Sequence, residues 1–303
     1  MKLKSLLVLI LAVVGSSVTA QSNLLNAKSP DEIGKKTAAQ LESDNDKPLP
    51  YGYVHDRDVL MGKMIWENID LDERVNFPLY YPVDTAFVGK ERRSLFAVLL
   101  KGIKDGKITE VYGDDYFNIK KSLKDMESVF KFIDTTDAGK DEINNYYEDY
   151  KSGKKVLDKQ FINETELDAS DISGYKVKGF WYFDKRQSEL KYRLMAICPL
   201  AVEARDKARG NNDPIELFWV YFPAVRNILH EAKAFNDRNS AMPITFDQLL
   251  NSRRFNGVVY KEENVYGDRT IQDYMKDNAQ SQLLESERVK EKIRNFEQDM
   301  WNY

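Results

Sequence analysis

Four acidic residues lie close together in the segment 59–82, VLMGKMIWENIDLDERVNFPLYYP, at positions Glu67, Asp70, Asp72 and Glu73. Two carboxylates held at a fixed separation can act as general acid and general base. Catalysis also needs a nucleophile, a partner base or a lid, and none accompanies these acids. In a helix, Glu67 and Asp70 would lie one turn apart on the polar face, which is typical of a scaffold.

The two histidines do not complete a metal site. His230-Glu231 resembles the start of a helical zinc motif, but the position of the second histidine, 234, is alanine. His55 stands near a predicted helix start, where we expect a capping or surface role. The segment 134–142, DTTDAGKDE, resembles a calcium loop, yet Ala138 and Asn145 occupy ligand positions.

Two further motifs also fail as reactive sites. The stretch 102–108, GIKDGKI, is one residue short of a phosphate loop and has isoleucine where a hydroxyl should meet magnesium. Cys198 is the single cysteine and lies in the apolar run RLMAICPL, which predicts a buried structural thiol without an intramolecular disulfide. We therefore expect a protein that is not an enzyme, with no catalytic residue, no cofactor and no metal.

The first 20 residues, MKLKSLLVLILAVVGSSVTA, have the pattern of a secretory signal peptide. The apolar run is too short to span a bilayer, and no cysteine near Ala20 could carry a lipid, so we expect cleavage there and no direct membrane insertion. Cleavage removes two lysines from 45 basic residues, which leaves 43 against 49 acids, a net charge of −6. This balance does not indicate a nucleic-acid partner.

The elements expected around these residues are both helices and strands, so the predicted fold class is α+β. Residues 21–50 are polar and predict an extended N-terminal arm, which serves as a tether or orders on a neighbouring subunit. We expect a helix from about residue 59 that ends before an extended stretch, NFPLYYPV. A second helix is predicted at 94–103, with Ser94 as its N-cap, followed by a turn and a short strand.

The tetrapeptide VYGD occurs twice, at 111–114 and 265–268. Each copy follows a Leu-Leu pair, a glycine turn and a β-branched run, which suggests two diverged copies of one helix-turn-strand unit. We expect each tetrapeptide just past its strand, with Tyr112 and Tyr266 in equivalent packed places. The predicted units are 51–150 and 175–303, joined by a polar connector at 151–174.

The second unit carries an insertion at about 203–243, in which 215–236 predicts a buried strand and then a helix. The tail from about Ile271 predicts a long C-terminal helix. An apolar seam runs along it between charged flanks and is our candidate interface, with own-core packing as the alternative. The residues of this seam are Val289, Ile293, Phe296, Met300 and the adjacent Trp301.

The signal peptide, the segment DKPLPYGYVHDRDVLMGKMIWENIDLDERVNFPLYYP and the later SLFAVLLKGIKDGKITEVYGDDYF together resemble the gliding motility family GldN, called PorN in non-gliding relatives. The resemblance runs through the mature chain. It implies a periplasmic scaffold of the type IX secretion system, peripheral to the outer membrane, that forms a ring with a GldK (PorK) type lipoprotein. It also implies contact with the periplasmic part of the inner-membrane motor complex.

Two other classes stay open from the residues alone. A periplasmic hydrolase would need a cleft that converges on Glu67, Asp70 or His230. A small-ligand or glycan binding module would use an exposed platform of the chain's 36 aromatic residues, which are 4 Trp, 17 Tyr and 15 Phe. Core packing and protein interfaces are the alternative uses of these aromatic side chains.

Overall fold

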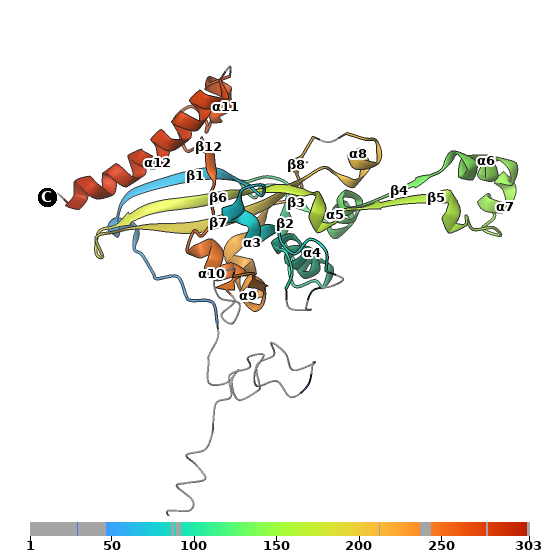
Figure 1. The fold of residues 1–303 in the computed structure, drawn as a ribbon, viewed down its shortest axis with the longest axis horizontal. Coiled ribbons are helices and arrows are strands. Elements are labelled where there is room, and N and C mark those ends of the chain that lie inside the picture. The colour runs from blue at the N-terminus through green and yellow to red at the C-terminus, as the bar shows by residue number, and fades with distance from the viewer. Residues whose placement is uncertain are drawn as a thin grey trace, which may run out of the picture.

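The centre of the molecule is an antiparallel six-stranded sheet (Figure 1). The computed structural model describes residues 29, 47–85, 88, 92–211, 213–236, 244–276 and 278–301, so the predicted signal peptide and nearly all of the predicted arm lie outside the described residues. The strand order is β12–β1–β6–β7–β8, and β9 also pairs with β7. The strands are β1 (Val59–Asp70), β6 (Ile172–Asp184), β7 (Glu189–Ala201), β8 (Ile215–Glu216), β9 (Val220–Tyr221) and β12 (Val258–Glu262).

Helices lie on both sides of this sheet, with α4, α9 and α10 on one side and α12 on the other (Figure 1). Short strand pairs and single turns of 3-10 helix connect the elements. The helices of the body are α3 (Phe77–Tyr80), α4 (Leu95–Lys104), α5 (Leu123–Phe130), α8 (Ala204–Ala208), α9 (Phe222–Glu231), α10 (Phe246–Asn251), α11 (Ile271–Tyr274) and α12 (Ala279–Trp301). The connecting elements are β2 (Val111–Tyr112) with β3 (Lys120–Lys121), β10 (Lys233–Ala234) with β11 (Ile244–Thr245), and η2 (Asp56–Asp58), η3 (Arg74–Asn76), η4 (Lys159–Phe161) and η5 (Ala169–Asp171).

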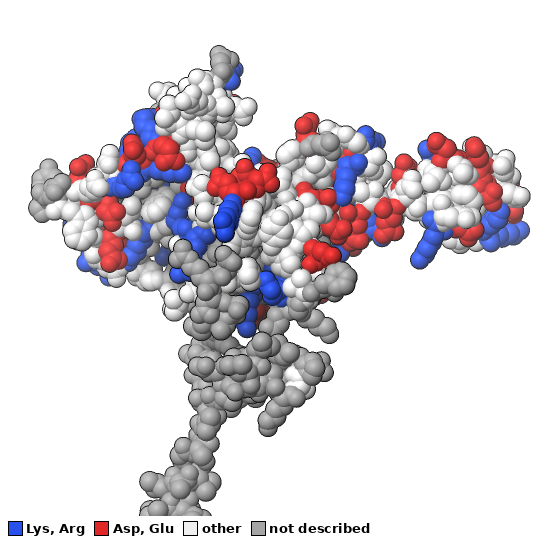
Figure 2. All heavy atoms as spheres, viewed as in Figure 1, with Lys and Arg blue, Asp and Glu red and all other residues white. Residues whose placement is uncertain are grey.

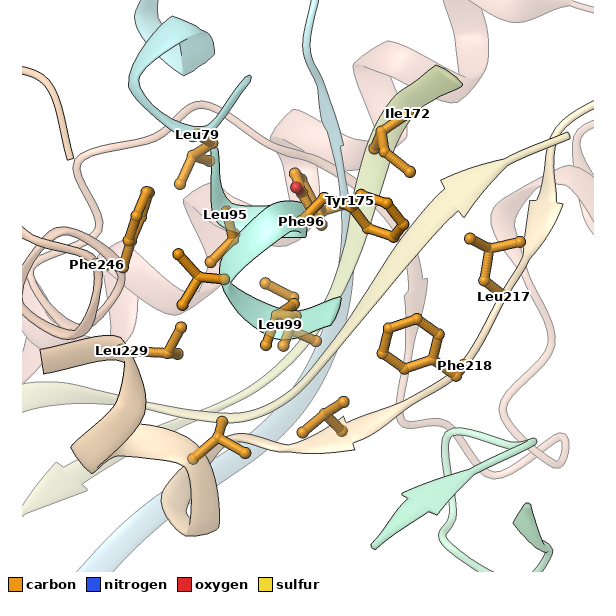
Figure 3. Packing of buried hydrophobic residues seen from close by; sticks show 14 of the residues in the cluster. Leu79, Leu95, Phe96, Leu99, Ile172, Tyr175, Leu217, Phe218, Leu229 and Phe246 are labelled. Atoms are coloured by element: carbon orange, nitrogen blue, oxygen red, sulfur yellow. The ribbon is translucent and has the colours of Figure 1, made fainter. Parts of the chain in front are cut away.

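The main core fills the space between the sheet and α4, α9 and α10 (Figure 3). Removing one large apolar side chain from water is worth about 1.5–3 kcal/mol, so this layer supplies much of the stability of the fold. The core residues with 1% exposure or less include Leu95, Phe96, Leu99, Tyr175, Phe218, Leu229 and Phe246. Cys198 is also fully buried, as the sequence predicts.

Several predicted elements are confirmed. The second helix is α4, and the Ser94 hydroxyl accepts from the Ala97 N–H at 3.3 Å as its N-cap. The insertion has short strands around buried residues 217–220, followed by helix α9. The α+β class and the long C-terminal helix α12 are present, although α11 at Ile271 is a separate single turn.

The helix expected from residue 59 is wrong, because this segment is strand β1. Ile65 and Ile69 are four residues apart, and this spacing places side chains on one face of a helix and also on one face of a strand. Pairing decides between the two: β1 pairs with β6 along its length and with β12 from Ile65 to Asn68. Gly62 fits this arrangement, since a Cβ there would lie 2.6 Å from the Phe180 ring.

The extended stretch expected at 76–83 is also wrong in its first half, where α3 forms. Pro78 lies in the first turn of α3, where a missing N–H breaks no helical hydrogen bond. The Asn76 side chain, fully buried, donates to the Asp70 and Asn256 carbonyls at 2.6 and 3.0 Å. This amide fixes the chain between β1 and α3 to the start of β12.

The helix-turn-strand order is present at both VYGD segments, but the tetrapeptides occupy different places. Val111 and Tyr112 form β2 itself, whereas 265–268 follows the end of β12. Tyr112 is buried and donates its hydroxyl to Glu110, whereas Tyr266 is 70% exposed. The expectation of equivalent tyrosines is therefore wrong. Strands from both predicted units share one sheet, and the unit boundaries at 51–150, 151–174 and 175–303 stay a prediction.

Residues 131–166, here called the projection, extend away from the rest of the molecule, the body (Figure 1). Strand β4 (Lys131–Thr135) pairs with β5 (Ile162–Glu166), and α6 (Asp137–Asn145) and α7 (Tyr147–Lys151) lie at the outer end. Phe130 and Leu167, immediately before and after it, are buried in the main core. The projection is thus anchored to the body at its two ends.

Candidate functional site

The candidate catalytic acids of the segment 59–82 form hydrogen bonds within the fold. Glu67 is 1% exposed, and its two carboxylate oxygens accept hydrogen bonds from Arg253 at 2.7 and 2.8 Å. The carboxylate of Asp70 accepts from the N–H of Asp72, and that of Glu73 accepts from the Asn256 amide. These contacts separate the acids instead of bringing two carboxylates together over one cleft.

The Glu67–Arg253 pair lies among aromatic rings. The Arg253 guanidinium stands 4.3 Å from the Tyr192 ring centroid and 5.0 Å from that of Trp181. Burial lowers the pKa of Arg253, and the hydrogen bonds and charge of Glu67 outweigh this and raise it. Burial also raises the pKa of the Tyr192 hydroxyl. The guanidinium is held as a permanent cation whose role is to join β1 to the segment before β12.

The sequence motifs that resemble metal sites are likewise structural. In the described part of the chain, no group of three or more His, Cys, Asp or Glu could hold a metal ion. His230 Nδ1 lies 3.9 Å from Asp247 Oδ2, and α9 ends at Glu231, so position 234 is not on that helix. The His55 side chain accepts from Arg57 N–H and caps η2, and Thr136 caps α6 in the calcium-like loop.

Three arginines fix the described end of the N-terminal segment to the body, a feature that sequence reasoning missed. Arg226 donates to the Leu49 carbonyl at 2.7 Å, Arg193 to Gly52 at 3.1 Å and Arg186 to the residue 53 carbonyl at 3.1 Å. The same Arg226 binds both carboxylate oxygens of Asp247, at 2.7 and 3.1 Å. The three arginines lie more than 130 positions from the carbonyls that they bind, so no local pattern signals this clamp.

A second feature missed by the sequence analysis joins Lys178 of β6 and Lys261 of β12. Their ammonium groups lie 4.9 and 4.3 Å from the Trp66 ring and 4.4 and 4.7 Å from the Tyr116 ring. Burial lowers the pKa of Lys178, and Asp115 opposes this shift. Tyr116 donates to Asp268 at 2.7 Å, so the segments that contain the two tetrapeptides meet here. Trp66 and Lys178 of this cluster are buried, whereas the Tyr116 ring is 45% exposed.

The candidate interface on α12 is divided by the structure. Val289 and Ile293 are 2% and 6% exposed and pack with Ile65, Val259 and Ile271 of the same chain. The Ser286 hydroxyl accepts from the N–H of Val259 at 2.8 Å, so this half of α12 covers the edge of β12.

The outer half of α12 is more open. The Phe296 ring makes an edge contact with Phe183 at 5.9 Å, Met300 is half-buried, and Trp301 is 68% exposed. A groove of about 380 Å³ beside α12 is lined by residues of this helix alone, four of six charged. Small-molecule sites are usually enclosed and mostly apolar, so this groove does not fit one. Its lining is Arg288, Glu291, Lys292, Asn295, Phe296 and Asp299.

None of the helices formed by the described residues is long and apolar enough to cross a membrane. Among curated proteins, no sequence matches the chain. A family model described as gliding motility associated protein GldN matches residues 54–302, a range that includes the sheet, the projection and all of α12. Because this match covers well over half of the 303 residues, the chain belongs to the GldN family of gliding motility associated proteins.

Proposed function

We propose that the chain is a non-enzymatic structural subunit of the type IX secretion and gliding motility machinery. Family membership supports a role in this machinery. The main support for a structural role comes from Glu67, the most buried of the candidate catalytic acids. Both of its carboxylate oxygens accept hydrogen bonds from Arg253. A carboxylate held in this way has no free oxygen for acid-base work on a substrate.

In this proposal the mature chain begins at Gln21, lies in the periplasm and is held at the outer membrane by a lipoprotein of the GldK (PorK) type. Many copies form a ring with that lipoprotein, and the ring contacts the periplasmic part of the inner-membrane motor. The signal-peptide pattern of residues 1–20 supports export.

Purification from the cells that make the protein tests this function. A tagged chain isolated in mild detergent should carry a stoichiometric outer-membrane lipoprotein, and its N-terminus should be Gln21. Electron microscopy of the preparation should show rings. Recovery of the chain alone as a monomer, or with Met1 intact, would contradict the proposal.

The outer half of α12 is the proposed contact with the lipoprotein. Trp301 is an exposed aromatic residue of the kind that anchors interfaces, and truncation of such an anchor commonly costs about 2 kcal/mol or more. Trp301→Ala should therefore reduce recovery of the lipoprotein while the isolated chain stays folded. Tyr266→Ala is the matched control, because Tyr266 is 70% exposed and lies outside α12. Equal recovery from both variants would remove α12 from the interface.

A further inference from the structure

The projection has almost no core of its own. Among residues 131–166, which the structure describes throughout, only Gly139 is buried. Its stem is the ribbon of β4 and β5, five residues each, which pair only with each other. Phe132 at the base of the ribbon packs on the main core. A two-stranded ribbon alone is at best marginally stable in water, so the part of the projection beyond this base gains little stability from the body.

Apolar side chains on the projection are left in water. Ile133 on the stem is 56% exposed, and at the outer end Tyr146, Tyr147 and Val156 are 48%, 56% and 84% exposed. Exposed apolar patches on polar surroundings mark contacts with other proteins. Tyrosine is also enriched at such contacts, because its ring is apolar and its hydroxyl stays solvated.

The charges of the projection are divided among its segments, and residues 137–150 at the outer end contain five acidic residues and one lysine. The segment 151–159 near the outer end contains four lysines and one aspartate. The stem and the residues that follow it, 131–135 and 162–171, contain five acidic residues and one lysine. Figure 2 shows lysines on the lower side of the projection, and acidic residues along its upper side and where it joins the body.

These charges are available to a partner. In the part of the chain that the structure describes, Lys154 and Lys159 form no ion pair, and both are exposed. On the stem, Ile133 lies opposite Glu164, and Lys131 lies opposite Glu166, so one face of the ribbon carries the exposed Ile133 together with both acids and Lys131. Glu164 and Glu166 remain about half exposed in their pairs with lysines.

We propose that the projection is a self-association element, in which the lysine-rich segment 151–159 of one copy docks on the acidic stem of a second copy. Opposite charges align the two surfaces, and the exposed tyrosines and Ile133 supply apolar contact. The two surfaces differ, so each contact leaves one lysine-rich segment and one acidic stem free, and the contact can repeat from copy to copy. This inference rests on the proposed function, because the self-association would supply the contact between neighbouring copies of this chain in the ring.

Sedimentation of the purified mature chain tests this contact. The wild type should self-associate at low salt and dissociate at high salt, because the Debye length falls from about 30 Å at 0.01 M to about 3 Å at 1 M. Lys154→Glu with Lys159→Glu should raise the dissociation constant about tenfold or more, since like charges then face each other. Glu164→Lys with Glu166→Lys should do the same from the other side.

Mixing supplies the decisive arm of the experiment. Equal amounts of the two variants should associate as the wild type does, because the reversed segment 151–159 of one now matches the reversed stem of the other. This recovery also shows that both variants are folded. Lys185→Glu with Lys276→Glu is the matched control, since it changes net charge equally on exposed residues of the body. The control should associate normally.

A wild type that stays monomeric at low salt, or variants that associate as the wild type does, would overturn the inference. These results are distinct from failure of the proposed function. If the chain still brings down its lipoprotein while charge reversal has no effect, the function stands and the projection contact falls. If the charge swap works but cells without the chain secrete and glide normally, the contact stands and the function falls.

Discussion

The body and the projection differ in how many of their side chains are buried within the molecule. In the body, a six-stranded sheet is covered by helices, and the charged residues that enter its interior, such as Glu67 and Arg253, are paired. In the projection, a two-stranded ribbon carries two short helices and leaves its tyrosines in water. The comparison indicates that the body folds by its own contacts, whereas the projection is built to gain contacts from another molecule.

The largest expected effect is on the buried pair of the body. Glu67→Ala leaves the Arg253 guanidinium buried without its partner, which typically costs about 3–5 kcal/mol. The free energy of unfolding in urea should fall by this amount, with tryptophan fluorescence as the probe, because Trp66, Trp181 and Trp219 all lie in the body.

The matched variant in the projection is Glu142→Ala, which removes the 2.7 Å pair with Lys155 at the surface. It should leave the unfolding midpoint of the body unchanged, since exposed ion pairs contribute little. A similar loss in both variants would contradict the difference drawn between the two regions.

The second expected effect divides α12 between core and contact surface. Ile293→Ala removes a 6% exposed side chain packed on the sheet and should lower the free energy of unfolding by about 2–5 kcal/mol. Trp301→Ala, in the next two turns, should change it by less than about 0.5 kcal/mol. Urea titrations measure both. If Trp301→Ala destabilises as much as Ile293→Ala, the end of α12 belongs to the core.

The smallest expected effect concerns pH. The Asn264 N–H and the Tyr116 hydroxyl bind the Asp268 carboxylate and hold its pKa below the ordinary value. A carboxyl whose pKa is lowered in the folded state adds stability at neutral pH, and this stability is lost as the pH falls through that lowered pKa. Below about pH 4 the wild type should lose stability more steeply than Asp268→Asn. Parallel curves in acid would show that this contact contributes nothing.

Local signals explain how far the sequence could predict the fold. Helix α4 is set by its own residues, with Ser94 as cap and apolar residues at helical spacing, and it was predicted almost to the residue. Strand β1 was mistaken for a helix, because Ile65 and Ile69 fit both structures and only pairing with β6 and β12 decides. A strand's partners are distant in sequence, so its local pattern is ambiguous.

The candidate site shows the same limit. Sequence reasoning placed Glu67 on a solvated face. In the structure Glu67 is buried and is paired with Arg253, which lies 186 positions away in the chain. The clamp of Arg226 on Leu49 spans 177 positions. By contrast, Val289 and Ile293 were identified correctly as an apolar seam from their spacing alone, and only the surface they cover had to come from the structure.

Hydrogen exchange of the chain, alone and in the proposed ring, tests most directly whether the body folds by its own contacts and the projection by contacts with a neighbour. In the isolated chain, amides of β1, β6 and β7 should be strongly protected, and those of β4, β5, α6 and α7 should exchange rapidly. On assembly, the amides of residues 131–166 should become protected while those of the central sheet stay as they were. Protection of the projection that is already high in the isolated chain, or that does not change on assembly, would contradict the account.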